Sequence, residues 1–156
     1  VQSMYYQVNC TYFSALGESD RKMLLARALQ IFMPGKPQVW YLDLFAGKND
    51  IDAVKKANSN GHKEINRTNL TTDQAISSLQ TDIVQDQLAL LRFRNTCPAF
   101  SWDSNIQVQS TASHQLTLTW SYQSHSARLT ADLSDFTFCI QSITPSGEET
   151  IIYQTT

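Results

Sequence analysis

Leu116-Thr117-Leu118-Thr119-Trp120-Ser121-Tyr122 alternates apolar side chains with hydroxyl-bearing ones. Because successive side chains of a strand point to opposite faces, this period of two predicts a strand with one buried face. The same period recurs in 127–133 and 136–140, and more weakly in 106–108 and 151–153. The last third of the chain is therefore expected to form an antiparallel meander of about five strands. Turn signals separate the later strands at Ser124-His125, Ser134-Asp135 and Pro145-Ser146-Gly147.

The pattern before Cys97-Pro98 is helical. Ser19 and Asp20 predict the start of a helix that runs to Met33 and stops at Pro34-Gly35. A second long helix is predicted from Thr71-Thr72 to the cationic segment 92–94. Between the two long helices, a short helix is expected around 50–57, followed by a polar, irregular segment over 61–69.

One apolar run in this helical half has the composition of a strand. Gln38-Val39-Trp40-Tyr41-Leu42 is rich in aromatic and β-branched residues and is bounded by Pro37 and Asp43. It predicts a strand buried on both faces, as in a parallel sheet. A single such strand needs neighbours. Either a larger barrel is missing its first half, or the chain rearranges or pairs with another chain.

The bulk composition narrows the classes of function. The chain has 156 residues, of which 42% are apolar and 17% charged, with a formal charge of −2 and no basic run. This argues against nucleic acid or an anionic membrane as a partner. The apolar stretch 23–33 is too short for a span of about 20 residues. With no signal peptide at the start, a cytoplasmic location is expected, and Cys10, Cys97 and Cys139 are expected as buried free thiols rather than in a disulfide.

Few residues suggest chemistry on their own. No catalytic carboxylate pair, metal-ligand spacing or cofactor motif is found, so no metal and no cofactor is expected. Asp43, after the expected strand, suits either an active-site acid or a cap for loop amides. His114 and His125 are expected at solvated turns.

Two polar clusters remain as candidates for binding. Lys63 and Arg67 lie four residues apart in a Gly-led loop and could clamp an anion, although a surface pair with Glu64 is the simpler interpretation. Tyr6 and Gln7 could line a sugar pocket by stacking and hydrogen bonding, or belong to the core.

Several segments together resemble the sucrose phosphorylases of the α-amylase superfamily. Tyr6-Gln7-Val8-Asn9 opens a stretch similar to their active-site loop. Further similar segments follow in the same order as in that family. These are Leu25–Ala28, Pro34-Gly35-Lys36-Pro37-Gln38-Val39-Trp40-Tyr41, Ala46–Asp50, Ile65-Asn66-Arg67 and Leu91–Phe100.

The resemblance implies an α+β fold made of two parts. Residues 1–100 would be the C-terminal end of a (β/α)8 barrel, with its seventh helix, eighth strand, active-site loops and last helix. Residues 101–156 would be a small antiparallel β domain. The family's catalytic Asp, Glu and third acid are expected before Val1, so no catalytic residue is assigned here and the chain alone is expected to be inactive.

The implied activity is that of a retaining α-glucoside phosphorylase or transglucosylase, which transfers glucose to phosphate and gives α-glucose 1-phosphate. An α-glucoside and inorganic phosphate would be its partners, and exposed barrel surfaces could support a homo-oligomer. The alternative is a non-enzymatic module that binds carbohydrate or associates with itself.

The resemblance also assigns binding residues. Tyr6 and Gln7 fall on the family's Tyr-Gln pair of the acceptor and phosphate pocket, and Arg67 lies in the later loop. Lys63 stands where the family has an Arg implicated in phosphate handling, Glu64 where it usually has Asp, and Met4 where an acid is expected. Relatives that act on sucrose 6-phosphate, glucosylglycerate or glucosylglycerol share the scaffold and differ in these loops.

Overall fold

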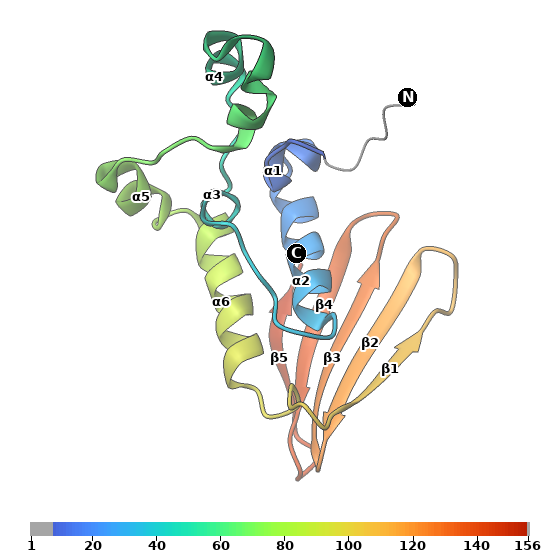
Figure 1. The fold of residues 1–156 in the computed structure, drawn as a ribbon. Helices are drawn as coiled ribbons and strands as arrows, with labels where there is room; N and C mark the ends of the chain where they lie inside the picture. The colour runs from blue at the N-terminus through green and yellow to red at the C-terminus, as the bar shows by residue number, and fades with distance from the viewer. Residues whose placement is uncertain (1–7, 156) are drawn as a thin grey trace. The chain divides into compact units, whose positions relative to one another are not determined.

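A computed structural model describes residues 8–155, except for the side chains of residues 58–60. The chain forms two compact units (Figure 1). Among the described residues, the first comprises 8–23 and Gln38–Gln85, and the second comprises Leu24–Pro37 and 86–155. These limits fall inside the two long helices. The boundary near residue 100, expected from the change in periodicity, stays a prediction.

The second unit contains a five-stranded sheet with the strand order β1-β2-β3-β4-β5, in which every neighbouring pair is antiparallel. The strands therefore follow one another across the sheet as they do along the chain (Figure 1). This confirms the predicted meander. The strands are β1 (Asn105–Gln109), β2 (Gln115–Tyr122), β3 (His125–Asp132), β4 (Thr137–Ile143) and β5 (Glu149–Gln154).

One face of the sheet is buried, as the alternation requires. Leu118, Leu129 and Ile140 lie opposite one another on successive strands and are 0–3% exposed. The indole of Trp120 donates a buried hydrogen bond of 2.8 Å to the carbonyl oxygen of Phe32. The Phe100 ring meets the rings of Phe32 and Trp120 edge-on, with 5.3 Å between centroids in each pair. The end of the first long helix therefore packs on the sheet.

The sheet has one irregularity at its last strand pair. The register between β4 and β5 shifts between Ile140 and Gln141. Exposed apolar residues accompany this edge, since Ile151 is 58% exposed and Ile152 is 36% exposed. A β-bulge of this kind bends a strand and increases its local twist.

Several predicted helices are confirmed. The first long helix, α2, spans Asp20–Phe32, and the Ser19 hydroxyl accepts from the N–H of Lys22 at 3.4 Å, as a cap does. The short helix α4 spans Ile51–Lys56 and is capped by Asp50. The polar segment that follows it is a 3-10 helix, η1 (Asn58–Asn66), rather than an irregular loop. The first unit also contains α1 (Tyr12–Ala15).

The predicted strand at 38–42 is wrong. Its second half belongs to α3 (Tyr41–Leu44), where the N–H of Leu44 donates to the carbonyl oxygen of Trp40 at 3.0 Å. A buried parallel strand is stable only when neighbouring strands take up its backbone groups. Residues 8–155 supply no such neighbour for this segment, and local helical hydrogen bonds are formed instead. The assignment of residues 1–100 to a barrel therefore stays a prediction.

The predicted second long helix is two helices, α5 (Thr72–Ser78) and α6 (Asp82–Thr96). The break lies at 79–81, where the Thr81 hydroxyl donates to the carbonyl oxygen of Ser78 at 2.7 Å. Hydroxyl side chains compete for backbone groups in this way and weaken a helix interior. No helix among the described residues is both long and apolar enough to cross a membrane.

Candidate functional site

The structure brings Lys63 and Arg67 to one cavity of about 190 Å³, which we call the Lys63–Arg67 pocket. Asn9, Trp40 and Asn66 complete its lining. All five residues belong to the first compact unit. A pair of cations, two amides and an aromatic ring therefore face the same small space.

Backbone and side-chain hydrogen bonds hold the segment that carries the two cations. The N–H of Asp50 donates to the carbonyl oxygen of Ile65 at 2.8 Å, and the Thr68 hydroxyl donates to the Asp50 carboxylate at 3.2 Å. The Tyr41 hydroxyl donates to the Thr68 carbonyl oxygen, and the Trp40 indole N–H to that of Asn66 at 3.3 Å. The end of η1 is thus fixed on both sides of Arg67.

The Asn9 side of the pocket is tied to the same framework. The Asn66 amide donates to the carbonyl oxygen of Cys10 at 3.4 Å. The backbone N–H of Tyr12 donates to the Asp43 carboxylate at 2.7 Å. Asp43 therefore accepts from one backbone amide at the start of α1, which fits one of the two roles that its position suggested, and it does not line the pocket.

The two cations differ in their partners. The Arg67 guanidinium lies 3.4 Å from the Glu64 carboxylate, and both side chains are about half exposed, at 55% and 43%. Such a surface pair contributes about 0–1 kcal/mol. Among residues 8–155, no carboxylate lies within ion-pair distance of Lys63. The loop thus combines the expected surface pair with one available point charge, an arrangement that suits a bound anion.

Trp40 is the pocket residue whose role the sequence did not suggest. It was expected in a buried strand, yet its ring is 53% exposed. An exposed indole beside amide side chains can stack on the apolar face of a sugar. The sequence placed Asn9 only in the stretch that resembles the family's active-site loop. No local signal links it to Lys63 and Arg67, which lie more than fifty residues further along the chain.

The remaining candidates lie elsewhere. Tyr6, Gln7 and Met4 lie outside the described residues. His114 is 3.5 Å from the Asp132 carboxylate in the other unit, far along the chain from the pocket. Within residues 8–155, no three His, Cys, Asp or Glu side chains group as ligands for a metal ion.

None of the three cysteines lines the Lys63–Arg67 pocket. All three are free thiols, but each is only partly buried, whereas burial was expected. Burial raises the pKa of Cys97, and burial also raises the pKa of Cys139. Because the thiolate is the reactive form, a raised pKa makes these two side chains poor nucleophiles at neutral pH.

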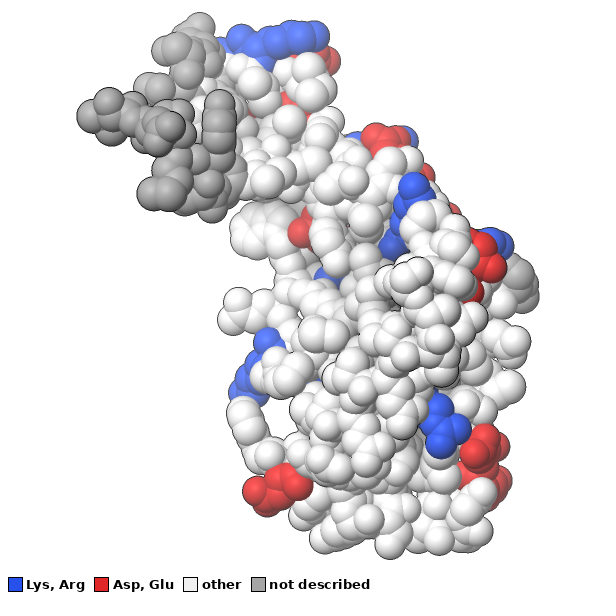
Figure 2. Space-filling model, turned by 90° about the vertical axis from the view of Figure 1, so that its right-hand side faces the viewer, with Lys and Arg blue, Asp and Glu red and all other residues white. Residues whose placement is uncertain are grey.

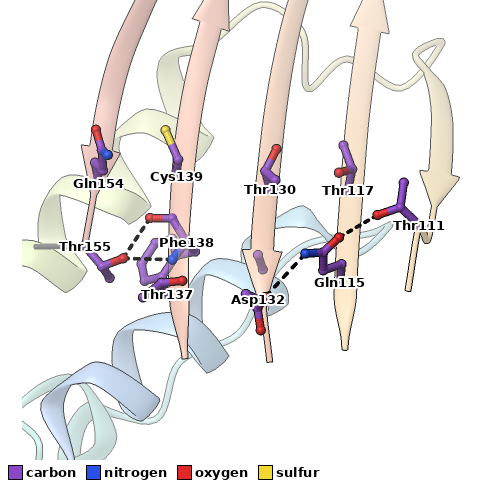
Figure 3. Close-up of a pocket in the computed structure, with 11 residues that line it drawn as sticks. Thr111, Gln115, Thr117, Thr130, Asp132, Thr137, Phe138, Cys139, Gln154 and Thr155 are labelled. Carbon is purple, nitrogen blue, oxygen red and sulfur yellow. Dashed lines mark hydrogen bonds between the residues drawn. The ribbon is translucent and has the colours of Figure 1, made fainter. Parts of the chain in front are cut away.

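A second hollow, of about 320 Å³, lies on the outer face of the sheet. Figure 3 shows Thr117, Thr130, Cys139 and Gln154 side by side on adjacent strands, in register with one another. The one carboxylate there, that of Asp132, already accepts hydrogen bonds, including one of 3.5 Å from Gln115. The remaining polar groups of this surface are neutral, and the pKa of its one thiol, that of Cys139, is raised by burial.

The charges visible in Figure 2 form small groups of mixed sign, separated by wide uncharged areas. No broad patch of one sign covers that face. A large single-sign surface is the usual electrostatic footprint of nucleic-acid binding.

Comparison with known proteins gives relatives but no matching family model. The chain is 54% identical over 136 residues to the sucrose 6(F)-phosphate phosphorylase of Ilumatobacter coccineus, a match that covers 87% of this chain and 26% of that protein. It is 40% identical to the sucrose phosphorylase of Bifidobacterium adolescentis, over 80% of this chain and 24% of that one. The chain thus spans about a quarter of the curated relatives it matches.

Solved structures agree with these relatives. The crystal structure of sucrose 6F-phosphate phosphorylase from Thermoanaerobacter thermosaccharolyticum superposes with a TM-score of 0.87 at 40% identity, over 96% of this chain and 30% of that one. A cyclic maltosyl-maltose hydrolase from Arthrobacter globiformis has a TM-score of 0.63 at 15% identity, over 92% of this chain and 32% of that one, and shows the fold alone.

Proposed function

Because this chain is homologous to the sucrose phosphorylases and sucrose 6(F)-phosphate phosphorylases, we propose that it is the C-terminal part of a retaining, glucosyl-transferring phosphorylase. The parent enzyme transfers glucose from an α-glucoside to phosphate and releases α-glucose 1-phosphate. Its two catalytic carboxylates, which form and resolve the covalent glucosyl intermediate, come from residues that precede this sequence. The chain alone has no activity.

One observation carries the role of this chain in that reaction: Lys63 and Arg67 line the same small pocket. A cavity of about 190 Å³ suits a phosphate group better than a whole disaccharide. The Lys63 ammonium carries its charge on a flexible side chain, whereas the Arg67 guanidinium is paired with the Glu64 carboxylate. The chain therefore contributes a phosphate-holding wall of the active site; Tyr6 and Gln7 enter this proposal through the family resemblance alone.

Binding of inorganic phosphate to the chain tests this wall directly. The indole N–H signal of Trp40, followed by NMR, should shift as phosphate is added and should saturate. Lys63→Ala should weaken this binding about tenfold or more, because a hydrogen bond to a charged group contributes roughly 1.5–3 kcal/mol. Lys55→Ala is the matched control, since Lys55 is an exposed lysine in the same unit that pairs with Asp52 at 3.3 Å.

Each result of these tests supports or contradicts one part of the proposal. Equal phosphate affinity in Lys63→Ala and Lys55→Ala would remove Lys63 from the site. In a longer polypeptide that extends this sequence to the length of its relatives, phosphate-dependent release of glucose 1-phosphate supports the proposal. Hydrolysis without phosphate dependence overturns the phosphorylase assignment.

A further inference from the structure

The second compact unit has a cavity of its own, of about 450 Å³, which we call the Trp102 pocket. Its volume falls within the roughly 300–1,000 Å³ that is usual for small-molecule sites. Trp102, Lys36, Arg94, Asn95, Ser101 and Phe100 are among the residues that line it.

A tight turn presents the indole of Trp102 to solvent. The N–H of Ser104 donates to the carbonyl oxygen of Ser101 at 3.3 Å, and the Ser104 hydroxyl donates to that of Ala99 at 2.6 Å. Trp102 occupies the second position of this turn and is 87% exposed. The turn fixes the backbone while the ring stays free to stack on a ligand.

Two cations, Arg94 and Lys36, also line the pocket. The Arg94 guanidinium lies 4.2 Å from the Phe100 ring centroid and 4.6 Å from that of Trp120, and it donates to the carbonyl oxygen of Gly35 at 2.9 Å. Lys36, next to Gly35, is exposed, and no carboxylate among residues 8–155 lies within ion-pair distance of it. None of the residues that line the pocket is acidic.

We propose that the Trp102 pocket binds a phosphorylated sugar. The apolar face of a pyranose ring stacks on the Trp102 indole, and its hydroxyls pair with the Asn95 amide and the Ser101 hydroxyl. The phosphate lies toward Lys36. This site lies in another compact unit from the Lys63–Arg67 pocket and does not depend on the function proposed above.

The three tryptophans of the chain report on both sites in one experiment. Trp40 lines the Lys63–Arg67 pocket, and Trp102 and Trp120 line the second pocket, where the indole N–H of Trp120 already donates to the carbonyl oxygen of Phe32. The indole N–H signals of the chain are followed by NMR while glucose 6-phosphate is added. The Trp102 signal should shift and saturate. A shift confined to Trp40, or no shift at all, overturns the proposal.

Variants test each part of the assignment. Trp102→Ala should weaken glucose 6-phosphate binding at this site about tenfold or more, followed through the backbone signals of Asn95 and Ser101, whereas Trp40→Ala should leave it unchanged. Lys36→Ala should weaken glucose 6-phosphate about tenfold and glucose hardly at all. Equal effects on both ligands would remove the phosphate from the assignment. Tighter binding of adenosine monophosphate than of glucose 6-phosphate would replace the sugar by a nucleotide.

Discussion

Arg27 is the largest fully buried side chain in the described part of the chain, at 2% exposure. Its Nε donates to the Gln87 side-chain oxygen at 2.9 Å, and Gln87 is itself 0% exposed. A second guanidinium nitrogen donates to Gln30. Neutral amides therefore hold a buried cation between α2 and α6 of the second unit. Removing one acceptor from such a group destabilises the folded state by more than the hydrogen bond itself contributes, because the charge stays buried.

We expect Gln87→Leu to lower the free energy of unfolding by about 1–3 kcal/mol, measured by urea denaturation. Leucine has a similar volume, so the loss reports the missing acceptor rather than a cavity. Gln107→Leu, at an exposed position of β1, is the control and should stay within about 0.5 kcal/mol of wild type. Equal losses in the two variants would show that the Gln87 side-chain oxygen does not contribute to the free energy of unfolding.

At the scale of elements, sequence patterns predicted the helices that local capping residues begin and the strands that bury only one face. The five strands, α2 and α4 follow from alternation and capping residues in the sequence. The structure of segment 38–42 was predicted wrongly, because its strand-like composition needs neighbouring strands that residues 8–155 do not provide. The break at 79–81 was not predicted, because it involves a hydrogen bond of the Thr81 hydroxyl and a helical stripe of apolar residues gives no sign of that bond.

The candidate site was predicted only in part, for the same reason. Lys63 and Arg67 are close in sequence, so a polar, Gly-led loop indicated them. Trp40 and Asn9 reach the pocket through hydrogen bonds that join distant segments, such as Trp40 to Asn66. Sequence spacing holds no information about contacts of that kind.

The capping box of α5 gives a prediction at the scale of one helix. The Thr71 hydroxyl accepts from the N–H of Gln74 at 3.2 Å, and the Gln74 side chain accepts from the N–H of Thr71 at 2.8 Å. Thr71→Ala should destabilise the helix by about 1 kcal/mol, seen as several-fold faster amide exchange across Thr72–Ser78. Thr72→Ala is the neighbouring control, and an equal acceleration there would contradict the role of the cap.

The turn between β3 and β4 gives a pH dependence. The Ser134 hydroxyl, followed by the Ser134 N–H, lowers the pKa of Asp132 by hydrogen bonding to its carboxylate. A group whose pKa is lower in the folded state contributes stability above its ordinary pKa of about 3.9, and this is lost as the pH falls through the folded value. Asp132→Asn should therefore destabilise the protein at pH 6, with a difference that shrinks on acidification below pH ~4.

Thermal unfolding at pH 6 and at pH 3 measures this effect. Asp103→Asn, at an exposed position in the same unit, is the control. A difference between wild type and Asp132→Asn that is the same at both pH values would contradict the assignment, since it would show that the carboxylate charge plays no part.

At the scale of the whole molecule, the two compact units are built differently. The second has a continuous sheet with a buried face formed by Leu118, Leu129 and Ile140. Within 38–81, the first has only short helices of four to nine residues, and among the described side chains of that range Leu42 is the one large apolar side chain that is buried. Short helices are marginal without tertiary packing. The two units should therefore differ in stability.

Hydrogen exchange followed by mass spectrometry tests this difference. Peptides from β2, β3 and β4 should be protected for the longest times, whereas peptides from 45–80 should exchange early. The reason is that ladder hydrogen bonds over a buried face open only with the whole sheet. Similar protection in both sets would show that the short helices are stabilised as strongly as the sheet.

The register shift beside β5 has a consequence for how the protein behaves at high concentration. β5 is an edge strand with two exposed isoleucines, the type of surface on which a further chain can build a fibril. The bulge between Ile140 and Gln141 twists that edge, so its free N–H and C=O groups no longer present a flat template. A single-residue deletion that restores regular pairing would be expected to make the chain aggregate more readily.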